Sequence, residues 1–367
     1  MPRILFVVQH RPDRSPSQRF RFEQYLSFLE SKGYQYDFSY LIDASDDKVF
    51  YAPGNLIRKA LIFFKSAVRR WKNVRHASEY DLIFIQREAF MTGSTWFEER
   101  FSKSNAKVVF DFDDAIWNHD VSEGNKSFGW LKDASKTSRI IACCDLVIAG
   151  NQYLADYASR FNSNVIIIPT TIDTDEYLPA SKPNQSDKVV IGWSGSITTI
   201  KHFELAIPFL KILKQKYGSK IDLRVIGDKS YSNPELEIIG KPWMKKSELS
   251  DLSAFDIGIM PIPDDDWSKG KCGLKGLQYM AMSIPAVMSP VGVNTEIIND
   301  GENGFLASSV KEWVEKLSIL VEDVQLRKRL GANARTTVLE RYSVKSQKEN
   351  YFKAFESVLS KKQIDKR

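Results

Sequence analysis

The sequence predicts an α/β protein with two doubly wound parallel sheets, and three observations support this fold class. Short apolar runs alternate with helical patterns along the chain, as expected where helices cover both faces of a parallel sheet. The chain has 367 residues, which is enough for two hydrophobic cores. A polar stretch rich in breaker residues, 177–188, separates two sets of strands. We therefore predict an N-terminal domain at 1–178, a linker at 179–188 and a second domain at 189–342.

The composition is that of an ordinary soluble protein, with 43% apolar and 27% charged residues. No apolar stretch approaches the roughly 20 residues that span a bilayer. The chain opens on a strand pattern at 4–8 instead of a signal peptide, so we expect a cytoplasmic protein. Cys143, Cys144 and Cys272 are too few and too close together for a disulfide framework, and we expect them to be small buried residues.

Apolar runs in the first domain predict strands at 4–9, 36–42, 81–86, 106–112, 145–150 and 165–170. The turn after the first strand, 10–17, contains no glycine, which argues against a dinucleotide-binding fold because that fold needs glycines near the pyrophosphate. A helix is predicted at 17–31. Arg19 and Arg21 lie in its first turn, where positive charge opposes the helix dipole. We predict that they meet an acceptor or donor phosphate; ordinary surface arginines are the alternative.

The net charge of +6 comes from one segment. Between Lys48 and Ser78 there is no acidic residue, and the basic residues are Arg58, Lys59, Lys65, Arg69, Arg70, Lys72 and Arg75. On a predicted helix at Arg58–Arg75, most of them gather on one side and the apolar residues on the other. Such a helix could lie in an anionic membrane interface; alternatively its apolar face packs on the sheet of its own domain and the charges are solvated. A local basic feature favours a partner surface of this kind and argues against nucleic acid.

Polar residues follow two strands of the first domain at their carboxyl ends, where open α/β sheets bind ligands. Arg87 follows the third strand, and Asp111, Asp113 and Asp114 end the fourth. Two carboxylates in Asp-x-Asp spacing could bind a divalent metal. Because no further ligand is in view, we predict a hydroxyl-binding or acceptor-orienting role for these acids instead of a metal site.

The second domain is predicted to carry strands at 189–193, 221–226, 236–239, 257–262, 286–288 and 305–307. After the fourth of them, Gly270 starts a helical pattern in which Lys271, Lys275 and Gln278 share one side. Lysines in a first helical turn are unfavourable, because the N–H groups there already carry partial positive charge. With Gly270, Gly273 and Gly276 keeping the backbone open, we predict that this helix start binds a diphosphate. Solvated surface lysines are the alternative.

Several motifs point to one family. They are Val190-Ile191-Gly192-Trp193-Ser194-Gly195-Ser196 with Lys201, the run from Gly270 to Leu306 with Pro285-Ala286-Val287 and Glu302-Asn303-Gly304-Phe305-Leu306, Arg327 with Leu330-Gly331-Ala332-Asn333-Ala334-Arg335, Phe110-Asp111-Phe112-Asp113-Asp114, and Gln86-Arg87-Glu88. Together they resemble glycosyltransferase family 4 (group 1), the retaining nucleotide-sugar transferases of the GT-B fold. The resemblance implies two doubly wound Rossmann-like domains facing a cleft, and a C-terminal helix at 343–367 that packs back on the first domain.

The resemblance also implies a reaction and its residues. A hexosyl-type sugar would pass from a nucleoside-diphosphate sugar to a hydroxyl acceptor, a glycan or a lipid-linked molecule of cell-surface polysaccharide synthesis, with retention and with no metal or other cofactor. The protein could then lie peripherally at the inner face of the membrane. The catalytic candidates are Asp113, Lys201 and Lys275. The donor-binding candidates are Gly195, Ser196, Lys271, Gly273, Gln278, Asn294 and Glu296, and the acceptor-side candidates are Arg19, Arg21, Arg87 and Asp114.

The chain departs from the family pattern at three positions. Most members carry two glutamates where this chain has Gly270 and Gln278, and an arginine where it has Ser196. The amide of Gln278 can still bind ribose hydroxyls, but it cannot act as an anionic clamp. A catalytically impaired nucleotide-sugar-binding protein is therefore the alternative prediction. A different GT-B enzyme, such as an epimerase or a phosphorylase, is a third.

Overall fold

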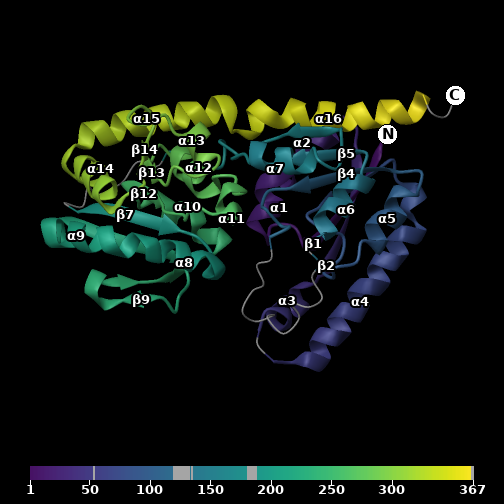
Figure 1. The fold of residues 1–367 in the computed structure, drawn as a ribbon, viewed down its shortest axis with the longest axis horizontal. Coiled ribbons are helices and arrows are strands. Elements are labelled where there is room, and N and C mark those ends of the chain that lie inside the picture. Colours follow the sequence, from purple (N-terminus) through teal and green to yellow (C-terminus); the bar gives the residue numbers. More distant parts are fainter. Residues whose placement is uncertain (53, 119–132, 134, 180–187, 365–367) are drawn as a thin grey trace. The chain divides into compact units, whose positions relative to one another are not determined.

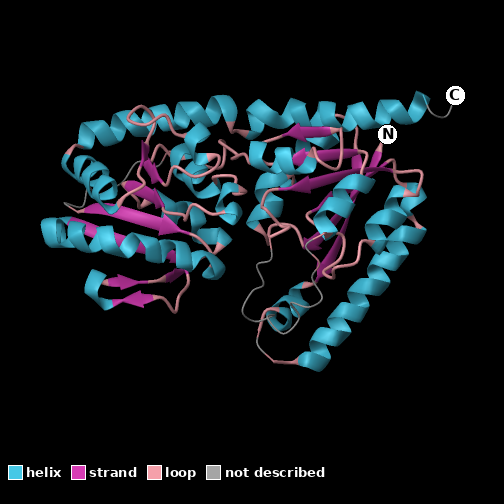
Figure 2. Ribbon diagram, viewed as in Figure 1, coloured by secondary structure: helices cyan, strands magenta, loops and turns pink. Residues whose placement is uncertain are grey.

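A computed structural model describes residues 1–52, 54–118, 133, 135–179 and 188–364. The chain divides into two units: unit 1 is Met1–Thr170 with Gln347–Arg367, and unit 2 is Thr171–Ser346. Each unit contains a six-stranded sheet whose neighbouring strands all run parallel, with helices packed around it (Figures 1 and 2). The predicted α/β class is confirmed. The linker predicted at 179–188 falls mainly on residues outside the described ones.

The sheet of unit 1 has the order β2-β1-β3-β4-β5-β6. Its strands are β1 (Arg3–His10), β2 (Gln35–Ile42), β3 (Leu82–Gln86), β4 (Lys107–Phe112), β5 (Leu146–Ala149) and β6 (Val165–Ile167). Every residue of β3, Leu-Ile-Phe-Ile-Gln, is buried, as expected for a parallel strand covered on both faces. β2 and β3 lie on opposite sides of β1, so the strand order reverses at β1. Ligands of such sheets bind near this reversal, at the carboxyl ends of the strands.

The helices of unit 1 are α1 (Pro16–Arg21), α2 (Leu26–Ser31), α3 (Ala44–Phe50), α4 (Leu56–Arg75), α5 (Trp96–Ser102), α6 (Lys136–Cys143), α7 (Gln152–Ala158) and α16 (Val344–Ile364), with 3-10 turns at Glu23–Tyr25 and Ala77–Glu79. The single helix predicted at 17–31 is wrong. Phe22 leaves the helical conformation at φ −139° and ends α1. Its ring stacks on Phe6 of β1 at 4.8 Å between centroids, so core packing interrupts the helix there.

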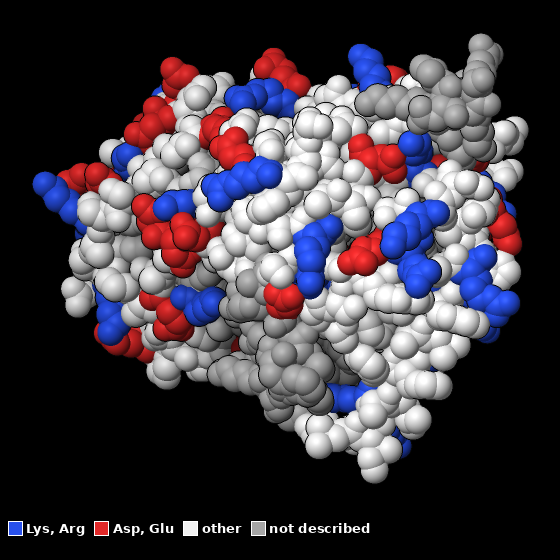
Figure 3. All heavy atoms as spheres, turned by 45° about the vertical axis from the view of Figure 1, so that its right-hand side comes forward, with Lys and Arg blue, Asp and Glu red and all other residues white. Residues whose placement is uncertain are grey.

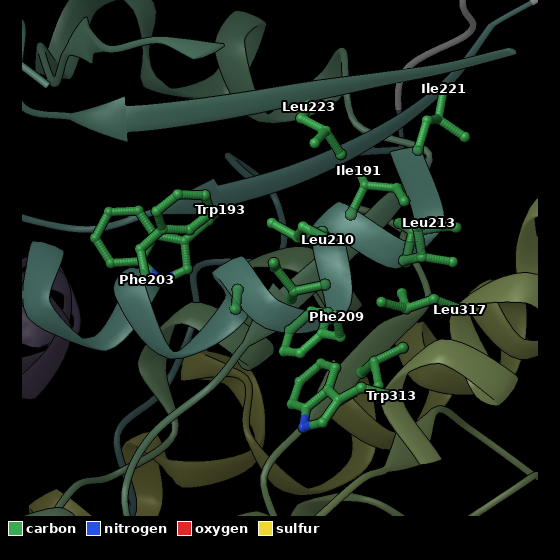
Figure 4. Packing of buried hydrophobic residues seen from close by; sticks show 14 of the residues in the cluster. Ile191, Trp193, Phe203, Phe209, Leu210, Leu213, Ile221, Leu223, Trp313 and Leu317 are labelled. Atoms are coloured by element: carbon green, nitrogen blue, oxygen red, sulfur yellow. The ribbon is translucent and has the colours of Figure 1, made fainter. Parts of the chain in front are cut away.

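The sheet of unit 2 has the order β11-β8-β7-β12-β13-β14. Its strands are β7 (Val189–Ser194), β8 (Ile221–Gly227), β11 (Lys241–Pro242), β12 (Ile257–Met260), β13 (Ala286–Met288) and β14 (Phe305–Leu306). The helices are α8 (Ile200–Phe203), α9 (Ile207–Tyr217), α10 (Lys245–Ser253), α11 (Asp266–Lys269), α12 (Leu274–Ala281), α13 (Asn294–Ile297), α14 (Val310–Glu322) and α15 (Val324–Arg341). Between β7 and α14 the core is closely packed: Phe209 stacks on Trp313 with 4.6 Å between ring centroids (Figure 4).

The strand predicted at 236–239 does not belong to the main sheet. Ile238–Ile239 forms β10, which pairs antiparallel with β9 (Ser232–Asn233) in a separate two-stranded sheet. The Asn233 side chain accepts a hydrogen bond from the Leu236 amide, and Glu237 has φ +54°, so the chain turns back on itself here. The sixth place in the main sheet is taken by β11 instead.

The 20-residue helix α4 (Figure 1) exposes large apolar side chains, among them Ile57, Leu61 and Phe64. Its buried residues are Lys59, Ile62, Ser66 and Arg70. Arg70 is fully buried and donates to the backbone carbonyl oxygens of Val8 (2.6 Å) and Ser39 (2.9 Å), so it fixes the polar side of the helix to the sheet. The expectation that the apolar face packs on its own sheet is therefore wrong. Within the described residues, no helix combines the length and apolar character needed to cross a membrane.

Candidate functional site

The loop after β7 is the first part of a candidate donor site at the carboxyl edge of the unit 2 sheet. Gly195 donates its N–H to the Ile226 carbonyl oxygen at 2.8 Å, which ties this loop to the end of β8. A Cβ at Gly195 would lie 2.2 Å from the Trp193 ring, so only glycine fits. Ser196 and Thr199 then cap a short 3-10 turn, each accepting a hydrogen bond from the other's backbone. Two predicted donor-binding residues, Gly195 and Ser196, thus lie on a tightly held loop.

Lys275 of α12 lies close to the loop after β7. Its Nζ lies 5.6 Å from the centroid of the Trp193 ring, directly beside the Gly195 turn. The helix begins at Leu274 with Gly273 as its N-cap, and the left-handed φ of +69° at Gly273 explains why a glycine is needed there. The predicted helix start at Gly270 is therefore wrong. Lys271 precedes the helix, with its Nζ 5.2 Å from the Trp267 ring centroid.

One buried histidine, His202, is influenced by the charges of all three predicted lysines. His202 is 4% exposed, and its Nδ1 atom has no hydrogen-bond partner among the described residues. Burial is the largest cause that lowers the pKa of His202, and together with the positive charges of Lys271, Lys275 and Lys201 it brings the pKa to about 4. The imidazole therefore stays neutral beside three cations. We did not predict a role for His202, although its position directly after Lys201 in the sequence was a signal.

The prediction that Gln278 lies open on the same side as the lysines is wrong. Its side chain is buried, and its Nε2 donates to the Tyr177 hydroxyl at 3.1 Å and to Glu248 Oε1 at 2.9 Å. Both amide hydrogens are thus used inside unit 2. The predicted contact with ribose hydroxyls through this amide is corrected accordingly.

The two remaining donor-binding candidates lie after β13. Asn294 is 1% exposed, and its Nδ2 donates to the Ser289 carbonyl oxygen at 3.0 Å, which holds the loop between β13 and α13. Its Oδ1 would lie 3.5 Å from a Cβ at Gly273, so this loop also meets the start of α12. Glu296 is exposed on α13.

The acceptor-side candidates of unit 1 form an ion-paired cluster after β3 and β4. Asp113 accepts hydrogen bonds from Arg87 Nε (2.8 Å) and Ser17 Oγ (2.7 Å), and Arg87 also pairs with Asp114. Burial acts to raise the pKa of Asp113, but the charge of Arg87 and its hydrogen bond outweigh burial and lower it. Arg87 has φ +64°, which is rare for a non-glycine residue and marks a locally strained site. Asp113 is thus held ionised.

Arg21 is corrected as an acceptor-side residue. It forms an ion pair with Asp111 at 2.6 Å, and neither side chain has exposed surface. It also donates to the Ile168 carbonyl oxygen, so its charge is compensated inside the core. Arg19 is 6% exposed, which is also unlike a surface arginine. The three acids of the predicted metal alternative therefore already face guanidinium groups: Asp111 faces Arg21, and the other two face Arg87.

Solved structures of similar fold exist at low sequence identity. A glycosyltransferase from Rickettsia africae ESF-5 has a TM-score of 0.68 at 15% identity, over 98% of both chains. Sucrose-phosphate synthase from Thermosynechococcus elongatus has a TM-score of 0.70 at 15% identity, over 98% of this chain and 99% of its own. HepE from Anabaena, solved in complex with UDP-glucose, has a TM-score of 0.67 at 14% identity, over 97% of this chain and 99% of its own. These likenesses establish the fold.

A comparison with curated proteins finds no match. Residues 188–323, which contain the lysine cluster and α12, match the family model described as "Glycosyl transferases group 1". The predicted resemblance is thereby confirmed: this is a chain of GT-B fold whose residues 188–323 form a group 1 glycosyltransferase domain.

Proposed function

We propose that the protein transfers a hexosyl group from a nucleoside-diphosphate sugar to a hydroxyl acceptor, with retention at the anomeric carbon and without a metal ion. The acceptor is a glycan or a lipid-linked molecule of cell-surface polysaccharide synthesis, and the enzyme acts in the cytoplasm at the inner face of the membrane. The group 1 glycosyltransferase domain supports this activity, as does the fold shared with HepE, which has been solved with UDP and with UDP-glucose.

The placement of Lys275 beside the Trp193 ring, next to the Gly195 turn, is the observation that carries the proposal. The positive charges of Lys271, Lys275 and Lys201 also lower the pKa of the buried His202. In such a transfer the bond between the sugar and the diphosphate breaks, and negative charge develops on the departing diphosphate. Preorganised donors stabilise this charge, and each is typically worth about 3–4 kcal/mol in the transition state. The ammonium groups of Lys271 and Lys275 near the start of α12, and that of Lys201, would supply that stabilisation. The backbone N–H groups of Gly195 and Ser196 would not, because they already donate to the Ile226 carbonyl oxygen and to Thr199 Oγ1.

The proposal assigns Asp113 to the acceptor side. Because Arg87 and Ser17 already donate to it, its carboxylate stays ionised near neutral pH and can accept a further hydrogen bond from an acceptor hydroxyl. The proposal keeps three further acceptor-side residues of unit 1, which are Arg19, Arg87 and Asp114. They would line the acceptor site near the carboxyl ends of β3 and β4. Arg21 is left out because its guanidinium is already paired with Asp111 inside the core.

One observation favours the alternative function, a nucleotide-sugar-binding protein with impaired catalysis. Where most family members carry glutamates, this chain has no side chain at Gly270, and the Gln278 amide is committed to Tyr177 and Glu248. A protein of this kind would keep the lysines, and hence the affinity for a diphosphate, but would lack turnover.

Calorimetry with a panel of nucleoside diphosphates and their sugars, followed by product analysis, separates the two functions. The proposed function predicts that one nucleotide binds and that its sugar is transferred, or slowly hydrolysed, with the α or β configuration of the donor kept in the product. Binding without turnover of any sugar nucleotide establishes the alternative. If none of the panel binds, both functions are wrong.

A further inference from the structure

The exposed face of α4 carries a row of large apolar side chains that the proposed chemistry does not use. Ile57, Leu61, Phe64, Val68 and Trp71 recur every three or four residues and so share one side of the helix. We call these five residues the apolar arc. Ile57 is 80% exposed, Leu61 64% and Phe64 68%, values that are unusual for large apolar side chains. A row of such residues, unlike single exposed ones, marks an interaction surface.

The apolar arc is wide and continues beyond its five members. Leu56 is exposed beside it, and with Phe63 on the other flank the apolar residues cover about 160° of the helix at roughly 100° per residue. Phe63 packs edge-on against Phe90 of unit 1, with 5.0 Å between ring centroids. Trp96 at the start of the neighbouring α5 is 39% exposed as well. A coiled-coil seam with another helix would need only a narrow stripe, so this width favours a continuous apolar medium.

The charges around the apolar arc have one sign. Arg58, Lys72 and Arg75 are exposed and form no ion pair within the described part of the chain, and the Arg75 guanidinium lies 4.7 Å from the Trp71 ring centroid. Lys65 and Arg69 are neutralised by Asp43 and Asp46 of the same unit. In Figure 3 the lower right of the surface, where α4 runs, is mainly white with blue atoms.

This charge pattern decides between two occupants of the apolar arc. The segment from Lys48 to Ser78 contains no acidic residue, so a second copy of α4 would bring only like charges together. An anionic surface, in contrast, complements Arg58, Lys72 and Arg75 and accepts the apolar side chains beneath them.

We propose that α4 lies in the plane of an anionic lipid bilayer, with the side chains of its apolar arc inserted at the boundary between headgroups and acyl chains. The proposal deepens the proposed function, because it names the surface on which a lipid-linked acceptor would be met. It differs from the prediction made from the sequence. Insertion of apolar side chains is the main contribution, and only three of the seven basic residues of the segment add electrostatic attraction, since the other four are buried or paired.

Flotation with vesicles of phosphatidylcholine, alone or mixed equally with phosphatidylglycerol, tests the proposal on the full chain. The protein is expected to float with the mixed vesicles. Leu61→Ser with Phe64→Ser removes two inserted side chains and should weaken binding by about 100-fold, since each contributes about tenfold or more when buried. The matched control is Phe161→Ser with Ile239→Ser, which removes two exposed apolar side chains outside α4 (42% and 83% exposed) and should bind as the wild type does.

The basic residues are tested separately. Arg58→Gln with Lys72→Gln should weaken binding to the mixed vesicles by about 30-fold and leave the weaker binding to phosphatidylcholine unchanged. Vesicles with brominated acyl chains should quench the wild type more than Trp71→Phe, because Trp71 is the inserted fluorophore.

Three results would overturn the proposal: no flotation of the wild type, equal flotation of the Leu61/Phe64 variant, or an equal loss in the control pair. A concentration-dependent dimer that the Leu61/Phe64 variant abolishes would show that a second copy covers the apolar arc instead. Thermal unfolding of each variant checks that the fold is intact. Nucleoside diphosphate binding by the same variants should be unchanged, so failure at the membrane is distinguishable from failure of the proposed function.

Discussion

Gln278→Glu places the family's usual residue back in the chain and gives a quantitative test of how this site is built. In the structure the Gln278 amide donates to Glu248 Oε1 at 2.9 Å and to the Tyr177 hydroxyl at 3.1 Å, and its side chain is 5% exposed. The substitution replaces the donor with a carboxylate and sets two acids against each other inside unit 2. We expect a loss of stability and no gain in nucleotide affinity.

The size of the loss follows from the geometry. Two full charges about 3 Å apart repel by about 5–6 kcal/mol at an effective dielectric constant of about 20. Protonating one of the two carboxylates at pH 7 costs about 4 kcal/mol, given the ordinary glutamate pKa of about 4.3, and this is less than the repulsion. The pair should therefore take up a proton, and the free energy of unfolding should fall by about 3–4 kcal/mol at pH 7.

The sign of the pH dependence is also fixed. The pKa of the introduced carboxyl is raised in the folded state, so the folded protein binds more protons than the unfolded one. The loss of stability should grow as the pH rises from about 4 to 7 and should be small below about pH 4. Urea unfolding of Gln278→Glu and of the wild type at about pH 4 and at pH 7 measures this loss of stability.

The matched control is Gln152→Glu. Gln152 Nε2 donates to Asp156 Oδ1 at 2.7 Å, the same kind of contact, but on the exposed surface of α7. Water and salt screen two exposed carboxylates, so the control should change stability by less than about 1 kcal/mol. If Gln278→Glu is as stable as the wild type at pH 7, or binds a nucleoside diphosphate more tightly, then Gln278 is open to the site and its assignment as an internal residue is wrong.

Three further predictions concern the ion pairs and His202. Asp111→Asn leaves the buried charge of Arg21 uncompensated and should lower the free energy of unfolding by about 3–5 kcal/mol in denaturant titrations, and a loss below about 1 kcal/mol would show that water reaches the pair. Arg87→Ala removes the cation that lowers the pKa of Asp113, so the acidic limb of the pH–rate profile should move to higher pH; an unmoved limb would take Asp113 out of the mechanism. His202 should stay neutral down to about pH 5 in NMR titrations, so stability falls as the pH drops from about 6.5 toward 4, and a bound nucleoside diphosphate should raise its pKa by offsetting the lysines. An ordinary pKa near 6.5 without nucleotide would mean that the imidazole is not buried beside the lysines.

The sheets were predictable from the sequence because their strands are buried on both faces. β3 is entirely buried, and such runs of apolar residues have few other uses in a chain of this composition. The predicted strand at 236–239 failed because a short apolar run does not show which sheet it joins. Here a turn at Glu237, with its positive φ, diverted it into a separate hairpin.

The orientation of α4 was not predictable, because its amphipathic pattern is the same whichever face packs inward. What decides it is Arg70, whose guanidinium reaches the carbonyl oxygens of Val8 and Ser39. These acceptors lie on two strands that are distant from α4 in the sequence, and no periodicity reports such a contact. The same reason applies to Gln278, since its partners Tyr177 and Glu248 come from two other elements.

The central claim is that the ammonium groups at the start of α12 bind the diphosphate of the donor. Titrating nucleoside diphosphate into the wild type and Lys275→Ala by calorimetry tests it most directly, with Lys328→Ala on the exposed side of α15 as the control. We predict that Lys275→Ala weakens binding by about 10- to 100-fold, the loss of one charged hydrogen bond, and that the control binds as the wild type does. Equal affinity of Lys275→Ala and the wild type would contradict the account.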